Sequence, residues 1–388
     1  MERRQIKRRL VVLAAHDRMQ RVNDVTYDFE QESHFFWLTG IREPGWQVII
    51  DGFADKAWLV APHIESTQAL FDGALSYEEA RRISGIKTII DLNEAKLLLH
   101  RLAEKYPVVD ALGPHPYRRH LGAVLNPAPT RLWRSLKKIF LEVRDCRTDF
   151  AVRRANKTAD EIKQVDRAVD VSIKGFQALR HVLTAVRFEY ELEAELTYAF
   201  RKAGADGHAY EPIVASGKNA LTLHYTNNND RLPKNGLVLI DAGARVNGYC
   251  ADITRTYAVG MPTERQRAVH GAVETAHHQI IALLGPGKSV KEYHEQVDEI
   301  MKATLDSLGL LKHPDDYRKY FPHAVSHGLG IDVHDSLGRP THFMPGMVLT
   351  VEPGIYIPEE EIGVRIEDDI LITKIGHRNL SGELPTSL

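Results

Sequence analysis

The chain has 388 residues, 43% of them hydrophobic, which is enough to bury two hydrophobic cores. Its formal net charge is only −2, so the composition argues against nucleic acid as the main partner. It contains 2 cysteines, too few for a disulfide framework, and no run approaches the roughly 20 apolar residues that a membrane helix needs.

The N-terminal segment, residues 1–15, is basic and then apolar, which is also the pattern of a signal peptide. Its apolar part, residues 10–15, is too short for the hydrophobic region of such a peptide, and charged residues follow at once. We therefore expect a cytoplasmic protein with no membrane partner.

The first part of the chain, residues 10–145, alternates strand-like and helical runs, which predicts an α/β domain. The strand-like runs are 10–15, 46–52, 56–62 and 88–92, and the helical runs are 76–83 and 93–106. We expect two domains, a smaller one over residues 1–150 and a second one over residues 151–388. The second begins with Thr158 and Glu161 at the spacing of a capping box, followed by the apolar stripe of a long helix.

The segment 237–259 consists of two β-branched runs joined by Asn-Gly at 247–248, which is a strong hairpin signal. A two-residue turn there places Asp241 opposite Thr254. Asp241 and Asp252 are then diagonal neighbours on one face of the hairpin, with backbones about 7 to 8 Å apart. A lone acid on a strand is usually just solvated. Two acids on one face of an apolar hairpin are costly unless a cation lies beside them.

Three histidines, His323, His327 and His334, occur among glycines in the segment 321–335. One histidine in such a place is most often a packing residue. Three within so short a segment instead indicate a site.

Two predicted strands follow. The first, residues 347–357, is broken by Pro-Gly at 353–354, which leaves Glu352 at the end of an apolar run without a partner. In the second, residues 363–373, the period of two places Arg365, Glu367 and Asp369 on one face.

Together these segments predict a site for two divalent metal ions. Two such ions about 3.5 to 4 Å apart need several anionic oxygens, and four carboxylates with one imidazole supply them. The predicted ligands are Asp241, Asp252, His327, Glu352 and Glu367.

At this point a family resemblance is clear. Over residues 155–380 the chain resembles the proline-specific metallopeptidases of the pita-bread fold, which comprise the Xaa-Pro aminopeptidases (aminopeptidase P) and the Xaa-Pro dipeptidases (prolidases). The similar stretches are HYTNNN (224–229), LIDAGARVNGYCADITRTY (239–257), HAVSHGLGIDVHD (323–335), MVLTVEPGIYI (347–357) and GVRIEDDILIT (363–373).

The resemblance implies an α+β fold, in which a pita-bread catalytic domain follows a smaller α/β domain with a mixed sheet. It implies that Asp241, Asp252 and Glu367 hold one ion, and that Asp252 and Glu367 also bridge to a second ion completed by His327 and Glu352. The ions are expected to be Mn(II), although Zn(II) and Co(II) also suit this ligand set. A homodimer is a further expectation from the family.

The resemblance also assigns roles. The family's other active-site groups fall on Arg365 and three histidines: His224, His323 and His334. Water acidified by the two ions can attack the carbonyl before proline, while Glu352 passes a proton to the proline nitrogen. His224 and His334 then stabilise the tetrahedral intermediate or position the peptide.

Two readings of the substrate remain open. A dipeptidase must hold the free carboxylate of its substrate, for which Arg339 is the candidate, although a solvated loop arginine is an equally good interpretation. Gly328 stands where aminopeptidase P usually has tryptophan, so we prefer a prolidase that hydrolyses the Xaa-Pro imide bond. The alternative is an aminopeptidase P acting on longer peptides, and a non-catalytic pita-bread binding protein is a distant one.

Overall fold

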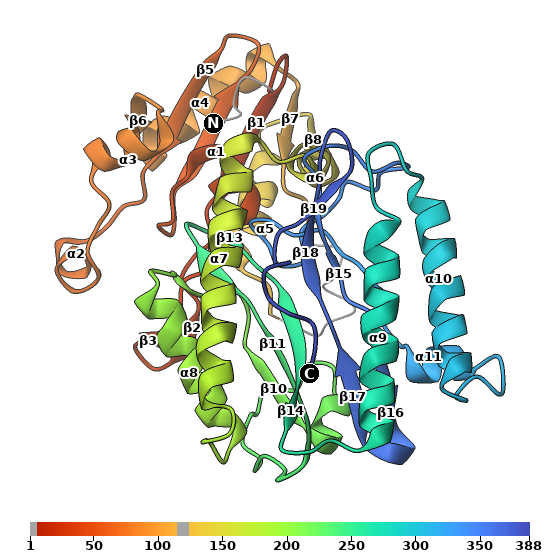
Figure 1. The fold of residues 1–388 in the computed structure, drawn as a ribbon. Helices are drawn as coiled ribbons and strands as arrows, with labels where there is room; N and C mark the ends of the chain where they lie inside the picture. Colours follow the sequence, from red (N-terminus) through yellow and green to blue (C-terminus); the bar gives the residue numbers. More distant parts are fainter. Residues whose placement is uncertain (1–5, 115–123) are drawn as a thin grey trace. The chain divides into compact units, whose positions relative to one another are not determined.

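The computed structural model describes residues 6–114 and 124–388 (Figure 1). The chain divides into two compact units, Met1–Phe150 and Ala151–Leu388. Among the described residues, none of the helices combines the length and the apolar character that crossing a bilayer requires.

Unit 1 contains a 6-stranded mixed sheet in the order β6-β5-β4-β1-β7-β8. Its strands are β1 Leu10–Ala14, β4 Gln47–Asp51, β5 Lys56–Val60, β6 Thr88–Ile90, β7 Val108–Ala111 and β8 Glu142–Asp145, with a small hairpin of β2 Gln20–Val22 and β3 Val25–Thr26. Its helices are α1 Ser33–Thr39, α2 Ser66–Asp72, α3 Tyr77–Ser84, α4 Leu92–Lys105 and α5 Pro127–Leu136, and α6 Arg147–Ala155 crosses the unit boundary. The predicted strand and helix runs of this unit are confirmed, and so is the mixed sheet.

Local sequence explains α4. Asp91 caps its N-terminus and forms a capping box with Glu94, so the first free N–H groups of the helix are satisfied. Ala95, Leu99 and Leu102 then fall on one face and are buried in the core of unit 1.

Unit 2 contains paired helices and short sheets. Its helices are α7 Ala159–Val182, α8 Glu189–Lys202, α9 Glu264–Ala282, α10 Val290–Ser307 and α11 Asp316–Tyr320, with 3-10 turns η3 Gly217–Leu221 and η4 Pro358–Glu360. Its strands are β9 Gly207–His208, β10 Ile213–Ser216, β11 Gly236–Ala242, β12 Ala244–Val246, β13 Tyr249–Cys250, β14 Ile253–Val259, β15 Val348–Val351, β16 Gly354–Ile357, β17 Ile362–Arg365, β18 Asp368–Ile372 and β19 His377–Asn379.

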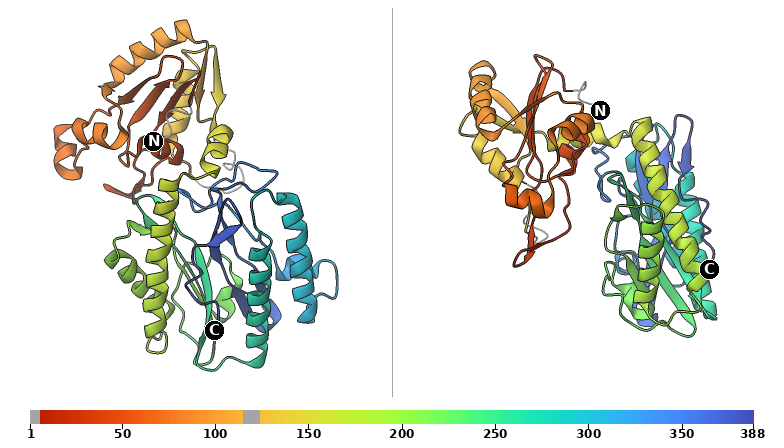
Figure 2. Two further views of the ribbon diagram at one scale, coloured as in Figure 1. Left: turned by 45° about the horizontal axis from the view of Figure 1, so that its top comes forward. Right: turned by 90° about the vertical axis from the view of Figure 1, so that its left-hand side faces the viewer.

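The strands of unit 2 lie between two pairs of helices, α7 with α8 on one side and α9 with α10 on the other (Figures 1 and 2). One hydrophobic core joins α7 and α8 to the sheet β10-β11-β14, and another joins α9 and α10 to β15 through β18. The helix α7 begins at the predicted capping box of Thr158 and Glu161. Unit 2 is therefore built as two halves, each a pair of helices packed on strands.

The predicted hairpin has the predicted register. Val246 pairs with Tyr249 and Asp241 pairs with Thr254. Asn247 and Gly248 both have positive φ, 51° and 81°, as the first and second central residues of a type I′ turn require.

A buried ion pair connects the second strand of this hairpin, β14, to the start of β18. The Arg255 guanidinium lies 2.7 Å from the Asp368 carboxylate, and both side chains are at most 2% exposed. Arg255 also donates hydrogen bonds to the carbonyls of Thr254, Glu367 and Leu384. One guanidinium thus joins β14, β18 and the C-terminal segment.

We expect Asp368→Ala to lower the free energy of unfolding by about 3 to 5 kcal/mol, because it leaves the Arg255 charge buried and uncompensated. The control is Asp166→Ala, which breaks an exposed pair with Arg378 and should cost less than about 1 kcal/mol. Urea denaturation of the metal-free variants measures both. Equal losses for the two variants would show that Arg255 does not depend on this partner.

Candidate active site

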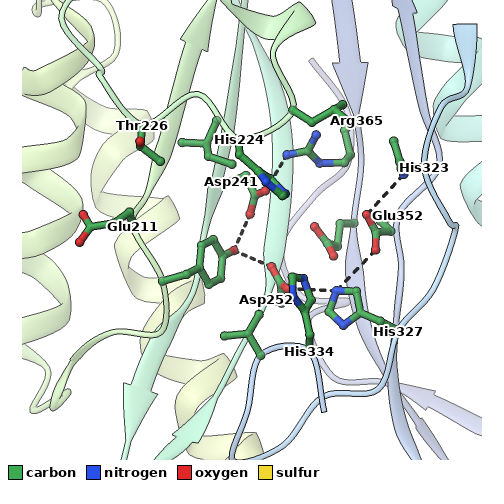
Figure 3. A pocket seen from close by; sticks show the side chains of 15 residues that line it. Glu211, His224, Thr226, Asp241, Asp252, His323, His327, His334, Glu352 and Arg365 are labelled. Atoms are coloured by element: carbon green, nitrogen blue, oxygen red, sulfur yellow. Dashed lines mark hydrogen bonds and ion pairs between the residues drawn. The ribbon is translucent and has the colours of Figure 1, made fainter. Parts of the chain in front are cut away.

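The structure brings all five predicted ligand residues into one cavity of about 340 Å³ (Figure 3). Asp241 lies on β11, and Asp252 lies just before β14. Glu352 follows β15, and Glu367 lies between β17 and β18. His327 comes from the segment between α11 and β15. Both halves of unit 2 therefore contribute to this site.

The predicted ligand atoms lie close to one another. His327 Nε2 is 3.4 Å from Asp252 Oδ2 and 3.5 Å from Glu352 Oε1. One ligand atom each from Asp252, His327 and Glu367 lie within 4.8 Å of one another. Oxygen and imidazole ligands at this spacing fit a divalent ion.

Two hydroxyl groups that the sequence did not point to hold the carboxylates in place. The Tyr210 hydroxyl donates to Asp241 and lies 2.5 Å from Asp252 Oδ1. The Thr254 hydroxyl donates to Glu367 Oε2 at 2.6 Å. Tyr210 lies in a short connection that matches no motif, whereas Thr254 could have been found from its predicted pairing with Asp241.

Arg365 is the only arginine or lysine that lines the cavity in the part of the chain that the structure describes. It donates to Asp241 Oδ2 at 2.6 Å and to the Thr254 hydroxyl at 3.1 Å. Asp369, which the sequence placed on one face with Arg365 and Glu367, does not line the cavity in the described part of the chain; its Oδ2 accepts from the backbone N–H of Asp252 at 3.0 Å.

The carboxylates of the site, when ionised, carry more negative charge than the single positive charge of Arg365 can neutralise. Burial raises the pKa of Glu367 well above its ordinary value, and the neighbouring Asp252 adds to that shift. Burial likewise raises the pKa of Glu352 to about 7. Carboxylates held this close together are stable in the charged form only beside a cation, so the residues fit divalent metal ions.

The same carboxylate charges also change the pKa of His327. Burial by itself would lower its pKa, but the hydrogen bond and charge of Asp252, together with the charge of Glu352, raise it to about 9. A bound metal ion instead requires the neutral ring, because its lone pair must reach the metal.

The remaining histidines line the same cavity. The rings of His327 and His334 meet edge to face, with centroids 4.5 Å apart. His323 Nδ1 lies 3.6 Å from Glu352 Oε2, and the exposed His224 stands at the rim. Apolar side chains of Ile213, Leu223 and Val333 complete part of the wall.

Arg339 lies elsewhere. Its side chain is exposed, its φ is +54°, and it does not line the cavity in the described part of the chain. The geometry therefore gives no support to its predicted role in holding a substrate carboxylate.

Gly328 has a structural reason to be glycine. The backbone N–H of Asp335 donates to its carbonyl at 2.8 Å, and a Cβ at Gly328 would lie 2.4 Å from the Asp335 carbonyl oxygen. This close approach holds the segment that carries His334 against the segment that carries His327. Gly328 is thus explained by backbone packing and is no sign of a dipeptidase.

Comparison with known proteins identifies two matching family models. The model of metallopeptidase family M24 matches residues 163–374, and the model of the aminopeptidase P N-terminal domain matches residues 3–109.

Individual relatives match over nearly the whole chain. A Xaa-Pro aminopeptidase of Haemophilus influenzae is 32% identical, covering 95% of this chain and 89% of that protein. The structure of proline aminopeptidase P II from Yersinia pestis has a TM-score of 0.84 and 33% identity, covering 100% of this chain and 96% of that one. Zinc-substituted aminopeptidase P of Escherichia coli in complex with product has a TM-score of 0.86 and 31% identity, covering 100% and 95%. The predicted pita-bread fold is confirmed.

We expect metal-free protein to lose stability as the pH rises from about 6.5 to about 9, the ordinary and the folded pKa of His327. Because the folded pKa is the higher one, the charged ring stabilises the fold below the ordinary value, and this contribution of roughly 3 kcal/mol disappears as the pH rises through the folded value. Urea denaturation at several pH values measures it.

Added divalent metal should flatten this dependence, since it binds the neutral ring. His327→Gln should remove the part of this loss that lies toward pH 9 in the metal-free protein and leave the part due to the raised pKa of Glu352, whereas the exposed His313→Gln should keep both. An unchanged pH dependence of stability in His327→Gln would show that this histidine does not cause it.

Proposed function

Because the chain belongs to metallopeptidase family M24, we propose that it is an Xaa-Pro aminopeptidase, which releases the N-terminal residue before proline from peptides. The observation that carries this proposal is the cavity that joins four carboxylates and a histidine to the rim residue His224 and the wall residue His334. The sequence alone led us to prefer a prolidase. Full-length similarity to Xaa-Pro aminopeptidases and the position of Arg339 outside the cavity favour the alternative.

We infer the ligand assignment from the family resemblance, and the convergence of the five residues on one cavity supports it. Asp241, Asp252 and Glu367 would hold one ion, and His327 and Glu352 would complete a second ion that Asp252 and Glu367 share. Bound divalent ions supply Lewis acidity, which lowers the pKa of water and polarises a peptide carbonyl. Manganese fits the oxygen-rich ligands, and so does zinc.

The chain's own groups supply the proton transfers. The Glu352 carboxylate faces the cavity beside His327 and His323, where it can take a proton from the attacking water and deliver it to the proline nitrogen as the bond breaks. The proline nitrogen must gain this proton to leave as a neutral amine, because the unprotonated nitrogen anion is too basic to be a leaving group.

Residues in the walls of the cavity can position the peptide substrate. His224 and His334 can donate hydrogen bonds to the peptide, and Ile213, Leu223 and Val333 offer apolar contact. A homodimer and a cytoplasmic location remain predictions of this proposal.

The first test compares an Xaa-Pro dipeptide with an Xaa-Pro-Xaa tripeptide, using metal-stripped protein with and without added Mn(II). We expect metal-dependent cleavage of the tripeptide at a higher kcat/KM than the dipeptide, because no arginine or lysine other than Arg365 lines the described cavity to hold a dipeptide's carboxylate. Cleavage of the dipeptide alone would restore the prolidase interpretation.

The second test is Glu352→Gln. We expect kcat on the tripeptide to fall at least about 100-fold, because the amide cannot carry the proton. The matched control is Glu360→Gln, a surface residue paired with Arg265, which should leave kcat unchanged. Metal content of both variants is measured in parallel, and full activity in metal-loaded Glu352→Gln would refute the role.

A further inference from the structure

Glu189 is a buried carboxylate that lies outside the ligand cluster. It is the first residue of α8 and is 0% exposed. A carboxylate taken out of water needs hydrogen-bond donors or a cation to replace the lost solvent. Its donors all come from one segment, residues 216–230, which we call the rim loop because it carries His224.

The two oxygens of this carboxylate hold opposite ends of the rim loop. Oε1 accepts from the backbone N–H and the hydroxyl of Ser216, both at 2.8 Å, and from Asn219 Nδ2 at 3.1 Å. Oε2 accepts from the Tyr225 hydroxyl at 2.8 Å and from the backbone N–H of Asp230 at 3.0 Å. The Glu189 backbone N–H donates in turn to the Asp230 carbonyl at 3.0 Å. A single residue of α8 thus ties the start of the rim loop to its end.

The rim loop supplies one wall of the cavity. His224 and Thr226 both line the cavity, and Figure 3 shows the ring of His224 pointing into it. Tyr225 stands between them in the sequence but has other neighbours. Its hydroxyl donates to Glu189, and its ring packs on the apolar cluster of β10 and β11. The anchor of the loop is therefore next in sequence to the residue that faces the peptide.

The ring of His224 has no support of its own. It is exposed, and it makes no hydrogen bond within the part of the chain that the structure describes. Its position therefore depends on the backbone of the rim loop, for which Tyr225 is the nearest anchor. Partial burial first, and the hydrogen bond to Glu189 second, raise the pKa of Tyr225 to about 12, so the hydroxyl remains a donor at neutral pH.

A second glutamate of α8 supports the same loop. Glu193 lies about one turn after Glu189, on the same face of the helix, and its Oε2 accepts from Asn228 Nδ2 at 3.0 Å. Asn228 is buried with a φ of +46°, and its side chain also bonds the Pro212 carbonyl and the Val214 backbone N–H. The N-terminal part of α8 therefore fixes the rim loop against β10.

We propose that Glu189 is a positioning residue of the substrate site, which holds the rim loop so that His224 faces the peptide. The inference rests on the proposed function for its effect on catalysis, but not for the anchoring of the loop. Glu189 does not line the cavity in the described structure, so it acts through the loop alone. The position calls for a carboxylate, because the amide of glutamine would direct N–H groups at other donors.

The first measurement is hydrogen exchange of the zinc-loaded protein, followed by mass spectrometry. We expect Glu189→Gln to speed exchange in peptides that cover the rim loop at least about tenfold, and to leave α9 as protected as in the wild type. The control is Glu195→Gln, a half-exposed residue of the same helix, which should leave the exchange unchanged. Wild-type protection of the rim loop in Glu189→Gln would overturn the inference whatever the activity is.

The second measurement uses Tyr225→Phe, which keeps the ring and removes one bond to Glu189. We expect kcat/KM on an Xaa-Pro-Xaa tripeptide to fall about tenfold, the size of one lost hydrogen bond to a charged acceptor. In a His224→Ala background the same change should cost less than about twofold, because the effect passes through His224. The control is the exposed Tyr190→Phe on α8, which should match the wild type. A tenfold fall that persists without His224 would refute the positioning role.

The outcomes separate the two proposals. If the wild type cleaves no Xaa-Pro peptide but Glu189→Gln loosens the rim loop, the proposed function fails and the anchoring stands. If the loop loosens and kcat/KM stays at the wild-type value, the positioning role fails. Where His224→Ala leaves too little activity to measure, calorimetric binding of the tripeptide to metal-loaded Glu352→Gln protein carries the same comparison. Should Glu189→Gln not fold, Tyr225→Phe takes its place in the exchange measurement.

Discussion

The structure of unit 2 depends on one electrostatic constraint: four carboxylates converge on a single buried place. Their mutual repulsion and their burial both oppose the charged form, as the raised pKa values of Glu352 and Glu367 show. Divalent ions remove this penalty, and a family of metallopeptidases is where such a cluster is expected. The fold must nevertheless hold the carboxylates in position before any ion binds.

Hydrogen bonds from neighbouring side chains hold the carboxylates in position. Tyr210 bridges Asp241 and Asp252, Thr254 holds Glu367, and Arg365 holds Asp241. On Asp241 both oxygens are engaged, Oδ1 by Tyr210 and Oδ2 by Arg365, whereas Thr254 engages only Oε2 of Glu367. Such support is what orients ligands and sets their basicity in metal sites generally.

Sequence reasoning pointed to the residues of this cluster because each lies in a strongly patterned segment. The Asn-Gly turn fixes the register of the hairpin, and that register alone determines that Asp241 faces Thr254. The period of two did the same for Arg365 and Glu367. Tyr210 was out of reach, because it comes from a connection without periodicity and approaches Asp241 only through the tertiary fold. Gly328 misled us for a related reason: its role is a close backbone contact with Asp335, which no local pattern reveals.

The division of the ligands between the two halves has a consequence for stability. Asp241 and Asp252 belong to the half built on α7 and α8, whereas His327, Glu352 and Glu367 belong to the half built on α9 and α10. The two halves meet at the site through the pairing of Thr254 with Glu367 and through Arg255, whose guanidinium is buried with Asp368. An ion that takes ligands from both halves binds only when they are docked, so its binding free energy adds directly to the stability of that docked state. The contacts behind the proposed ligands, such as the buried pair of Arg255 with Asp368, perform the same task without metal.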